Sequence, residues 1–224
     1  MDNLLHFPTT TLVDKNVPKN AFYGRSSDTH LRDFLTHEFE SITWLYKLAP
    51  ATLNVEDGEL VHEIDVFVCR MKEEYYSINP FCGMDKLLPR HTLFIIFYGD
   101  KVDLLMHHKE VTRVQGEEKW KCDMTELQRN VHLDTDLLQI EGQNMDAVYH
   151  ALLRQISGLN ISNEEEYKEQ TDLRKRIEAL KKQIATLQKK IRSEKQFNRQ
   201  VELNAETRQL KKALQELGNK LNAK

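Results

Sequence analysis

Three charged side chains near one strand have the types that metal-dependent nucleases use. Such enzymes hold Mg²⁺ with carboxylates from a strand, and a nearby lysine steadies the attacking water or the leaving charge. Glu63 and Asp65 alternate along the most regular strand pattern of the chain, and Lys72 follows at its end. No acidic-x-Lys element follows on the next strand. We therefore expect Glu63 and Asp65 to lie on the solvent face of a half-exposed sheet, with a divergent metal-dependent nuclease as the alternative.

The sequence "MHHKE" contains three side chains of types that bind metal ions. Successive strand residues point to opposite faces, so His107 and His108 cannot chelate one ion from a regular strand, and Glu110 would meet His107 only if the chain turned. No HExxH or paired-cysteine spacing accompanies them. The sequence therefore predicts no metal site and no cofactor.

Signatures of nucleophilic and nucleotide-dependent enzymes do not occur. The chain has no GxSxG, GxxxxGK[ST] or GxGxxG sequence, which removes the nucleophile elbow and the glycine-rich phosphate cradles. Cys69, Cys82 and Cys122 are odd in number and widely spaced, as is typical of reduced, half-buried thiols in a cytosolic protein. These features exclude an ATPase and favour a protein without catalytic activity.

The strongest group of candidate residues is basic and lies in the C-terminal tail. Cations bind phosphates through charge and counterion release, and an exposed aromatic ring can stack on a base or fill a protein pocket. In the alternative interpretation the aromatic ring packs onto Val201 and the cations are only solvated. The residues of this candidate surface for nucleic acid or a partner are Lys189, Lys190, Arg192, Lys195, Phe197 and Arg199.

The charge of the chain is unevenly distributed. From residue 163 onward, 16 Lys and Arg stand against 10 Asp and Glu, a net charge of +6, so the total of −3 leaves −9 for the rest. An acidic body with a basic arm points to an acidic partner for the arm, either nucleic acid or an acidic protein face. A solvated helical surface is the other explanation, because Lys and Glu are good helix formers.

The elements that position these residues belong to the α+β class. Residues 1–26 have an irregular pattern, and a helix then begins at Ser27 or Asp28. Strands are predicted in "ITWLYKLAP", "ELVHEIDVFVCRMK" and "EKWKCDM", a hairpin in "HTLFIIFYGDKVDLLMHHKEV", a short helix in "GMDKLLPR", and a helix after Asn144 that ends at Gly158. Residues 1–160 are therefore expected to form a globular domain with a mixed or antiparallel sheet and flanking helices.

Residues 161–224 are predicted to form a coiled-coil-like antiparallel helical hairpin. Two apolar stripes at heptad spacing differ in register by two residues, which neither a stutter nor a stammer explains. Ser193 and Gln196 have the spacing of a capping box that can restart a helix there without Gly or Pro. An unbroken helix that forms a homodimer is the alternative. The stripes are Leu173, Ile177, Leu180, Ile184, Leu187 and Ile191, and then Leu203, Thr207, Leu210, Leu214, Leu217 and Leu221.

No window of the sequence approaches 18 consecutive apolar residues, and the first residues lack the basic region of a signal peptide. We therefore expect a cytoplasmic protein without a membrane partner.

Several segments together resemble a bacterial family known as domain of unknown function 4391. They are "WLYKLAPATLNV", "VHEIDVF", "MDKLLPRHTLFIIFY", "GQNMDAVYHALLRQISG" and "EKQFNRQVELNAETRQLKK", and the match runs from about Val17 to Lys212. The resemblance implies a small bacterial protein encoded beside helicases and DNA methyltransferases, in restriction-like or antiviral defence gene clusters. It supplies no catalytic residues.

These observations predict a non-catalytic accessory subunit. Its acidic body would dock on a larger enzyme, a helicase or DNA methyltransferase of a defence or restriction-modification system. Its basic arm would contact that partner or DNA. The divergent nuclease and a homodimeric coiled-coil scaffold remain as alternatives.

Overall fold

The computed structural model describes residues 5–24, 28–114, 117–133, 135, 138–158 and 164–222. The chain divides into two compact units, residues 1–160 and residues 161–224. The first contains a β-sheet with helices, and the second is a pair of helices.

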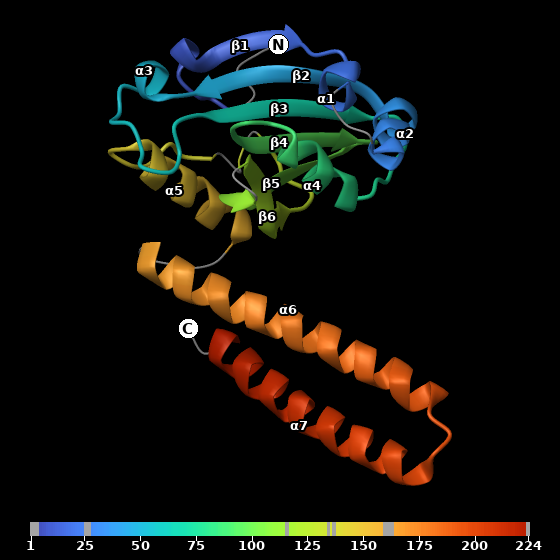
Figure 1. Ribbon diagram of the computed structural model, residues 1–224. Helices are drawn as coiled ribbons and strands as arrows, with labels where there is room; N and C mark the ends of the chain where they lie inside the picture. The colour runs from blue at the N-terminus through green and yellow to red at the C-terminus, as the bar shows by residue number, and fades with distance from the viewer. Residues whose placement is uncertain are drawn as a thin grey trace. The chain divides into compact units, whose positions relative to one another are not determined.

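The strands of the first unit form one six-stranded sheet in chain order (Figure 1). Neighbouring strands are antiparallel except β3 and β4, which are parallel. A parallel pair needs a crossover connection, and α4 lies in that connection. The sheet is therefore mixed, which confirms the α+β class. The strands are β1 (Leu12–Asn16), β2 (Phe39–Leu48), β3 (Ile64–Met71), β4 (His91–Tyr98), β5 (Lys101–Val114) and β6 (Glu117–Gln128).

In the described part of the first unit, a short 3-10 helix (Thr9–Thr11) and five α-helices accompany the sheet, and two of the α-helices are capped as the sequence predicts. The Asp28 side chain accepts hydrogen bonds from the backbone N–H groups of His30 and Leu31 at the start of α2. Asn144 caps α5 through the N–H of Ala147, and Gly158 ends it with a φ of 65°. The helices are α1 (Asn20–Tyr23), α2 (Thr29–Glu38), α3 (Pro50–Leu53), α4 (Asn79–Lys86) and α5 (Met145–Ser157).

The central strands are buried on both faces. Phe67 and Cys69 of β3 belong to an aromatic-rich core shared with α1, α2 and α4, while Val66 and Val68, which point the other way, are also buried. A strand covered on both sides has a continuous apolar sequence instead of an alternating one. The expected half-exposed sheet is therefore wrong at β3.

The N-terminal segment is more regular than expected. Within residues 1–26, β1 pairs with β2 as an edge strand, and α1 contributes Phe22 to the core. The β-strand propensities of the residues in "LVDKN" do not predict this strand, because an edge strand that is open to water on one side can be polar. The short helix α4 also starts earlier than predicted, at Asn79.

The second unit is a helical hairpin, as predicted. Helix α6 (Glu164–Ser193) and helix α7 (Phe197–Asn222) pack against each other, joined by residues 194–196. Ile177, Ile184 and Leu187 of α6 and Leu203 and Thr207 of α7 are each buried to more than nine-tenths. Among the described helices, none is both long and apolar enough to cross a membrane.

The turn between the two helices is where the sequence places it, but its chemistry differs. Ser193 was expected to cap the second helix; instead its hydroxyl donates to the carbonyls of Lys189 and Lys190 at the end of α6. In the turn itself, Glu194 Oε1 accepts from the N–H groups of Lys195 and Gln196, the two residues that precede α7. A carboxylate there also favours the positive end of the α7 dipole.

Leu203→Ala should weaken the hairpin by about 2–3 kcal/mol, because it removes a buried contact between the two helices. Hydrogen exchange should become faster in both α6 and α7, and equally so at low and high protein concentration. Val201→Ala is the matched control, since Val201 is 52% exposed on the same helix. A loss of protection that depends on protein concentration would instead indicate helices paired between chains.

Candidate functional site

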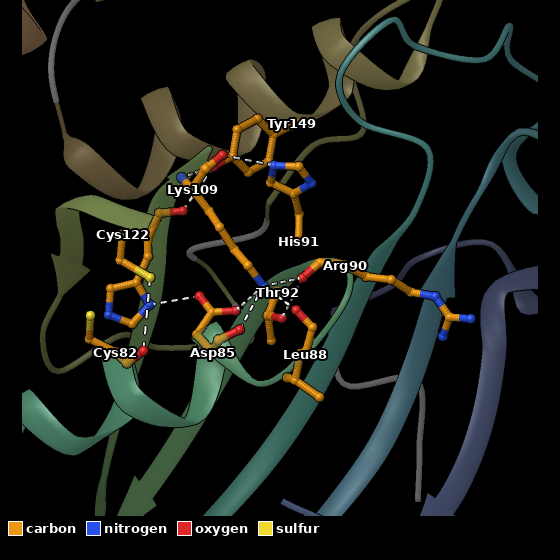
Figure 2. A network of polar contacts seen from close by, with 10 residues as sticks. Cys82, Asp85, Leu88, Arg90, His91, Thr92, Lys109, Cys122 and Tyr149 are labelled. Carbon is orange, nitrogen blue, oxygen red and sulfur yellow. Dashed lines mark hydrogen bonds and ion pairs between the residues drawn. The ribbon is translucent and has the colours of Figure 1, made fainter. Parts of the chain in front are cut away.

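A buried ammonium group holds together one end of the sheet (Figure 2). Lys109 of β5 is 3% exposed, and its Nζ donates to the carbonyls of Asp85, Leu88 and Arg90 at 2.6, 2.7 and 2.6 Å. Its fourth acceptor is Asp85 Oδ1 at 3.0 Å. Burial lowers the pKa of Lys109, and the charge of Asp85 opposes that shift. Burying a charged group is costly unless hydrogen-bond acceptors replace its water, and these four oxygens do so for the Lys109 ammonium.

Asp85, on the last turn of α4, is fully buried and uses both carboxylate oxygens. Oδ1 accepts from Lys109, and Oδ2 lies 2.8 Å from Nδ1 of His107. Burial alone would raise the pKa of Asp85, but the hydrogen bond from His107 and the charge of Lys109 outweigh it and hold this pKa below its ordinary value. Asp85 is therefore ionised near neutral pH.

Helix α5 contributes to the same cluster through Tyr149. The ladder between β4 and β5 ends at the pair Leu93 and Met106. Just beyond that end, the Tyr149 hydroxyl donates to the His107 carbonyl at 2.8 Å and accepts from the Lys109 N–H at 3.2 Å. The tyrosine therefore satisfies backbone groups of β5 that β4 no longer pairs with.

His91, the first residue of β4, packs on the same cluster. Its Nε2 lies 3.1 Å from the Lys109 carbonyl, and its ring centroid is 4.4 Å from that of Tyr149. Burial lowers the pKa of His91 to about 4, so the ring is neutral at pH 7. A neutral imidazole can donate its Nε2–H to that carbonyl.

Two cysteines lie near Asp85 in the fold. Cys82 precedes Asp85 by one turn of α4, and Cys122 of β6 pairs with Lys109 in the ladder. The Cys122 thiol contacts the Cys82 carbonyl at 3.9 Å. Asp85, His107 and Cys122 offer ligand-type atoms that all lie within 4.8 Å of one another. The hydrogen bond from Cys122 lowers the pKa of Cys82 to about 6.

A cavity of about 740 Å³ opens at the start of β3 and β4. Because these strands are parallel, their first residues lie at the same edge. Glu63 lies in the cavity wall and forms ion pairs with Lys47 at 2.7 Å and Arg90 at 3.0 Å, while Asp65 lies 3.5 Å from Arg90. The lining residues are Glu59, Leu60, His62, Glu63, Pro89, Arg90, His91, Val111 and Trp120.

The structure brings Glu63 and Asp65 together but leaves Lys72 elsewhere. Lys72 follows the far end of β3, about 23 Å from Asp65 at 3.3 Å per residue, and its Nζ donates to the Thr36 carbonyl. Asp65 is only 4% exposed, so its expected position on a solvent face is wrong. Burial and the neighbouring Glu63 raise the pKa of Asp65 to about 6. These three residues do not assemble a nuclease site.

The histidine pair separates as the strand period predicts. His107 faces Asp85, and His108, the next residue, points the other way along β5. The side chain of Glu110 lies outside the described part of the structure. Two spacings behind this cluster belong to no recognised motif. His107-x-Lys109 puts an imidazole and an ammonium on one face of β5, and Cys82-x-x-Asp85 puts a thiol and a carboxylate on one face of α4.

The predicted basic surface lies at the turn of the hairpin. All six of its residues are exposed, and Phe197, the first residue of α7, is 76% exposed. Arg199 pairs with Glu202 at 2.6 Å. Within the described residues the other four cations have no ion pair. These residues are Lys189, Lys190, Arg192, Lys195, Phe197 and Arg199 and are called the tip surface below.

A family model described as "Domain of unknown function (DUF4391)" matches residues 5–214 of the 224-residue chain. The chain belongs to this family. The match spans both the sheet and most of the hairpin, so the two units occur together in the family pattern. No curated protein and no solved structure matches the chain.

Lys109→Met should lower the free energy of unfolding by about 3–5 kcal/mol, because it leaves the buried Asp85 carboxylate without its counter-charge. Urea unfolding measures the change. Lys101→Met, which alters an exposed lysine of the same strand, should change it by less than about 0.5 kcal/mol. Equal effects of the two substitutions would contradict the role given to Lys109.

His91→Gln should reduce the acid sensitivity of the fold. Because the pKa of His91 falls to about 4 in the folded protein, the unfolded chain takes up a proton first as the pH drops below 6.5. The wild type should therefore lose up to about 3 kcal/mol of stability from this residue between pH 6.5 and pH 4. Urea unfolding across this range should show a smaller loss for the variant; an unchanged loss would contradict the assignment.

Proposed function

We propose that this protein is a non-catalytic interaction subunit that binds nucleic acid through the tip surface of its hairpin. The observation that carries the proposal is Phe197, an aromatic ring 76% exposed among cations at the end of a rigid helical pair. Burying such a ring against a base or within a partner recovers the free energy that its exposure to water costs.

Charge favours nucleic acid as the occupant. Residues 189–202 contain five Lys and Arg against two Glu, a net charge of +3 in fourteen residues. A cationic groove or ridge combined with an aromatic platform is how proteins bind single strands without reading sequence. Val201, one helical turn after Phe197, is 52% exposed and extends the apolar strip along the same helix.

The polar groups of the first unit do not favour the nuclease alternative. Glu63 and Asp65 are neutralised by Lys47 and Arg90, so their charge is already compensated by protein cations. Lys72 lies at the other end of β3. The homodimeric scaffold is also less favoured, because the apolar stripes of α6 and α7 are already buried against each other within one chain.

The opposite charges of the two units suggest which kind of partner the protein has. An acidic first unit with a basic hairpin suits a subunit that docks on a larger DNA-processing enzyme while the hairpin contacts nucleic acid. A helicase or DNA methyltransferase of a bacterial defence or restriction-like system is the partner that we propose. The free cysteines Cys69, Cys82 and Cys122 suit the reducing cytoplasm.

The test is binding of the full chain to single-stranded and duplex DNA at several salt concentrations. The variant Lys195→Glu/Arg199→Glu should lower the affinity at least tenfold at low salt and reduce the salt slope by about 2, because two phosphate contacts are lost. Phe197→Ala should weaken single-strand binding by about 1–3 kcal/mol with little change in the salt slope.

The matched control is Lys211→Glu/Lys212→Glu, which reverses two exposed charges further along α7. It should retain most of the affinity if binding is localised at the tip surface. Equal losses in both double variants would indicate a diffuse electrostatic attraction. Unchanged DNA binding in the tip variant, with loss of co-purification with the partner enzyme from the native host, would assign the tip surface to a protein instead.

A further inference from the structure

The cavity at the start of β3 and β4 has apolar side chains in its wall that are open to water. Leu60 is 75% exposed and Val111 is 46% exposed, and both line the cavity together with Pro89 and Trp120. Val111 and Trp120 are partners in the ladder between β5 and β6, so their side chains lie side by side on one face of the sheet. Exposing these side chains to water costs free energy, which a ligand that covers them would recover.

The loop that carries Leu60 is tied to the start of α5. The Asp146 carboxylate accepts hydrogen bonds from three successive backbone N–H groups, which belong to Glu59, Leu60 and Val61 and lie at 2.7, 3.1 and 2.7 Å. Gly58 comes so close to the same carboxylate that a Cβ atom on it would lie 2.6 Å from Asp146 Oδ1. Because these contacts hold the backbone, the leucine is kept in its exposed position at the cavity.

The buried cluster around Lys109 holds another part of the cavity wall. The Lys109 ammonium lies 4.5 Å from the ring centroid of Trp120, and the ring centroid of His91 lies 5.3 Å from the same ring. The Arg90 carbonyl accepts from this ammonium, while Figure 2 shows the Arg90 guanidinium extended away from it. These contacts order the wall before any ligand binds, which lowers the entropy cost of binding.

The charges around the cavity favour a cation. Its lining has two carboxylates, Glu59 and Glu63, against the single guanidinium of Arg90, a net charge of −1 with the histidines counted as neutral. Lys47 and Asp65, which pair with these groups, cancel each other. Glu63 is compensated by two cations, whereas Glu59 is exposed and has no ion pair with another described residue. An anion would find the guanidinium already paired, so the uncompensated charge is the one at Glu59.

We propose that this cavity binds a small organic amine in which one positive charge is joined to an aromatic or other apolar group. The apolar group would lie against Trp120, Val111 and Leu60, and the ammonium would pair with the Glu59 carboxylate. The volume of about 740 Å³ lies within the range of roughly 300–1,000 Å³ that is usual for small-molecule pockets. This site is separate from the tip surface and does not depend on the function proposed for it.

The first experiment is isothermal titration calorimetry of the full chain with three ligands that share an indole ring. Tryptamine is positively charged, tryptophol is neutral and indole-3-acetate is negatively charged. Tryptamine should bind roughly threefold or more tighter than tryptophol, because its ammonium pairs with a carboxylate, and indole-3-acetate should bind most weakly. Methylamine has the charge without the ring and should not bind measurably. No tryptamine binding at millimolar concentrations, or equal affinities for the three indoles, would overturn the proposal.

Substitutions of two exposed residues locate the binding. Glu59→Gln should lower the affinity for tryptamine to about that for tryptophol and leave tryptophol binding unchanged, since only the charge pair is lost. Leu60→Ser should weaken the binding of both ligands by about fivefold or more, because it removes apolar surface that covers the indole.

Each substitution has a matched control away from the cavity. Glu73→Gln changes an exposed carboxylate beyond the far end of β3, and Leu12→Ser changes a 44% exposed leucine of β1. Neither control should alter the affinity for tryptamine or tryptophol. Equal losses of tryptamine binding in Glu59→Gln and Glu73→Gln would show a general attraction to an acidic protein and would contradict binding in this cavity.

Discussion

The structure of the first unit depends on one buried ion pair, Lys109 with Asp85. An ammonium in the interior is tolerated only where acceptors surround it, and here they come from the end of α4 and the segment leading to β4. The lysine therefore fixes the crossover that makes β3 and β4 parallel. Without that fixed crossover, neither the start of β4 nor the position of Asp85 would be defined.

The same crossover determines which side chains meet at the start of β3 and β4. Since β3 and β4 begin together, Arg90 comes next to Glu63 and Asp65 and forms ion pairs with both, while Lys47 provides a second positive charge at Glu63. Burial explains why the Asp65 carboxyl keeps its proton up to about pH 6. Ion pairing at this edge therefore has a structural explanation, and no catalytic role is needed to account for these carboxylates.

Local signals in the sequence predict the helices, strands and turns better than they predict the buried cluster around Lys109 and Asp85. The caps at Asp28 and Asn144, the β4–β5 hairpin and the folded-back tail follow from side-chain spacing and turn residues, which act over a few positions. The buried pairing of Lys109 with Asp85 spans 24 residues and two elements, and a single sequence does not distinguish a buried charge from a solvated one. Alternation misled at Asp65 because both faces of β3 are buried, so the strand has no solvent face.

The turn of the hairpin contributes little to the stability of the helical pair. Its two helices are held against each other by buried apolar side chains such as Ile184, Leu187 and Leu203. The residues of the turn are charged and exposed and take no part in this packing. Gathering Lys189, Lys190, Arg192, Lys195 and Arg199 at one end adds like-charge repulsion and contributes no packing. An exposed Phe197 at the same end costs further free energy in water. Under the proposed function, a polyanion with stacking bases would relieve both costs at once.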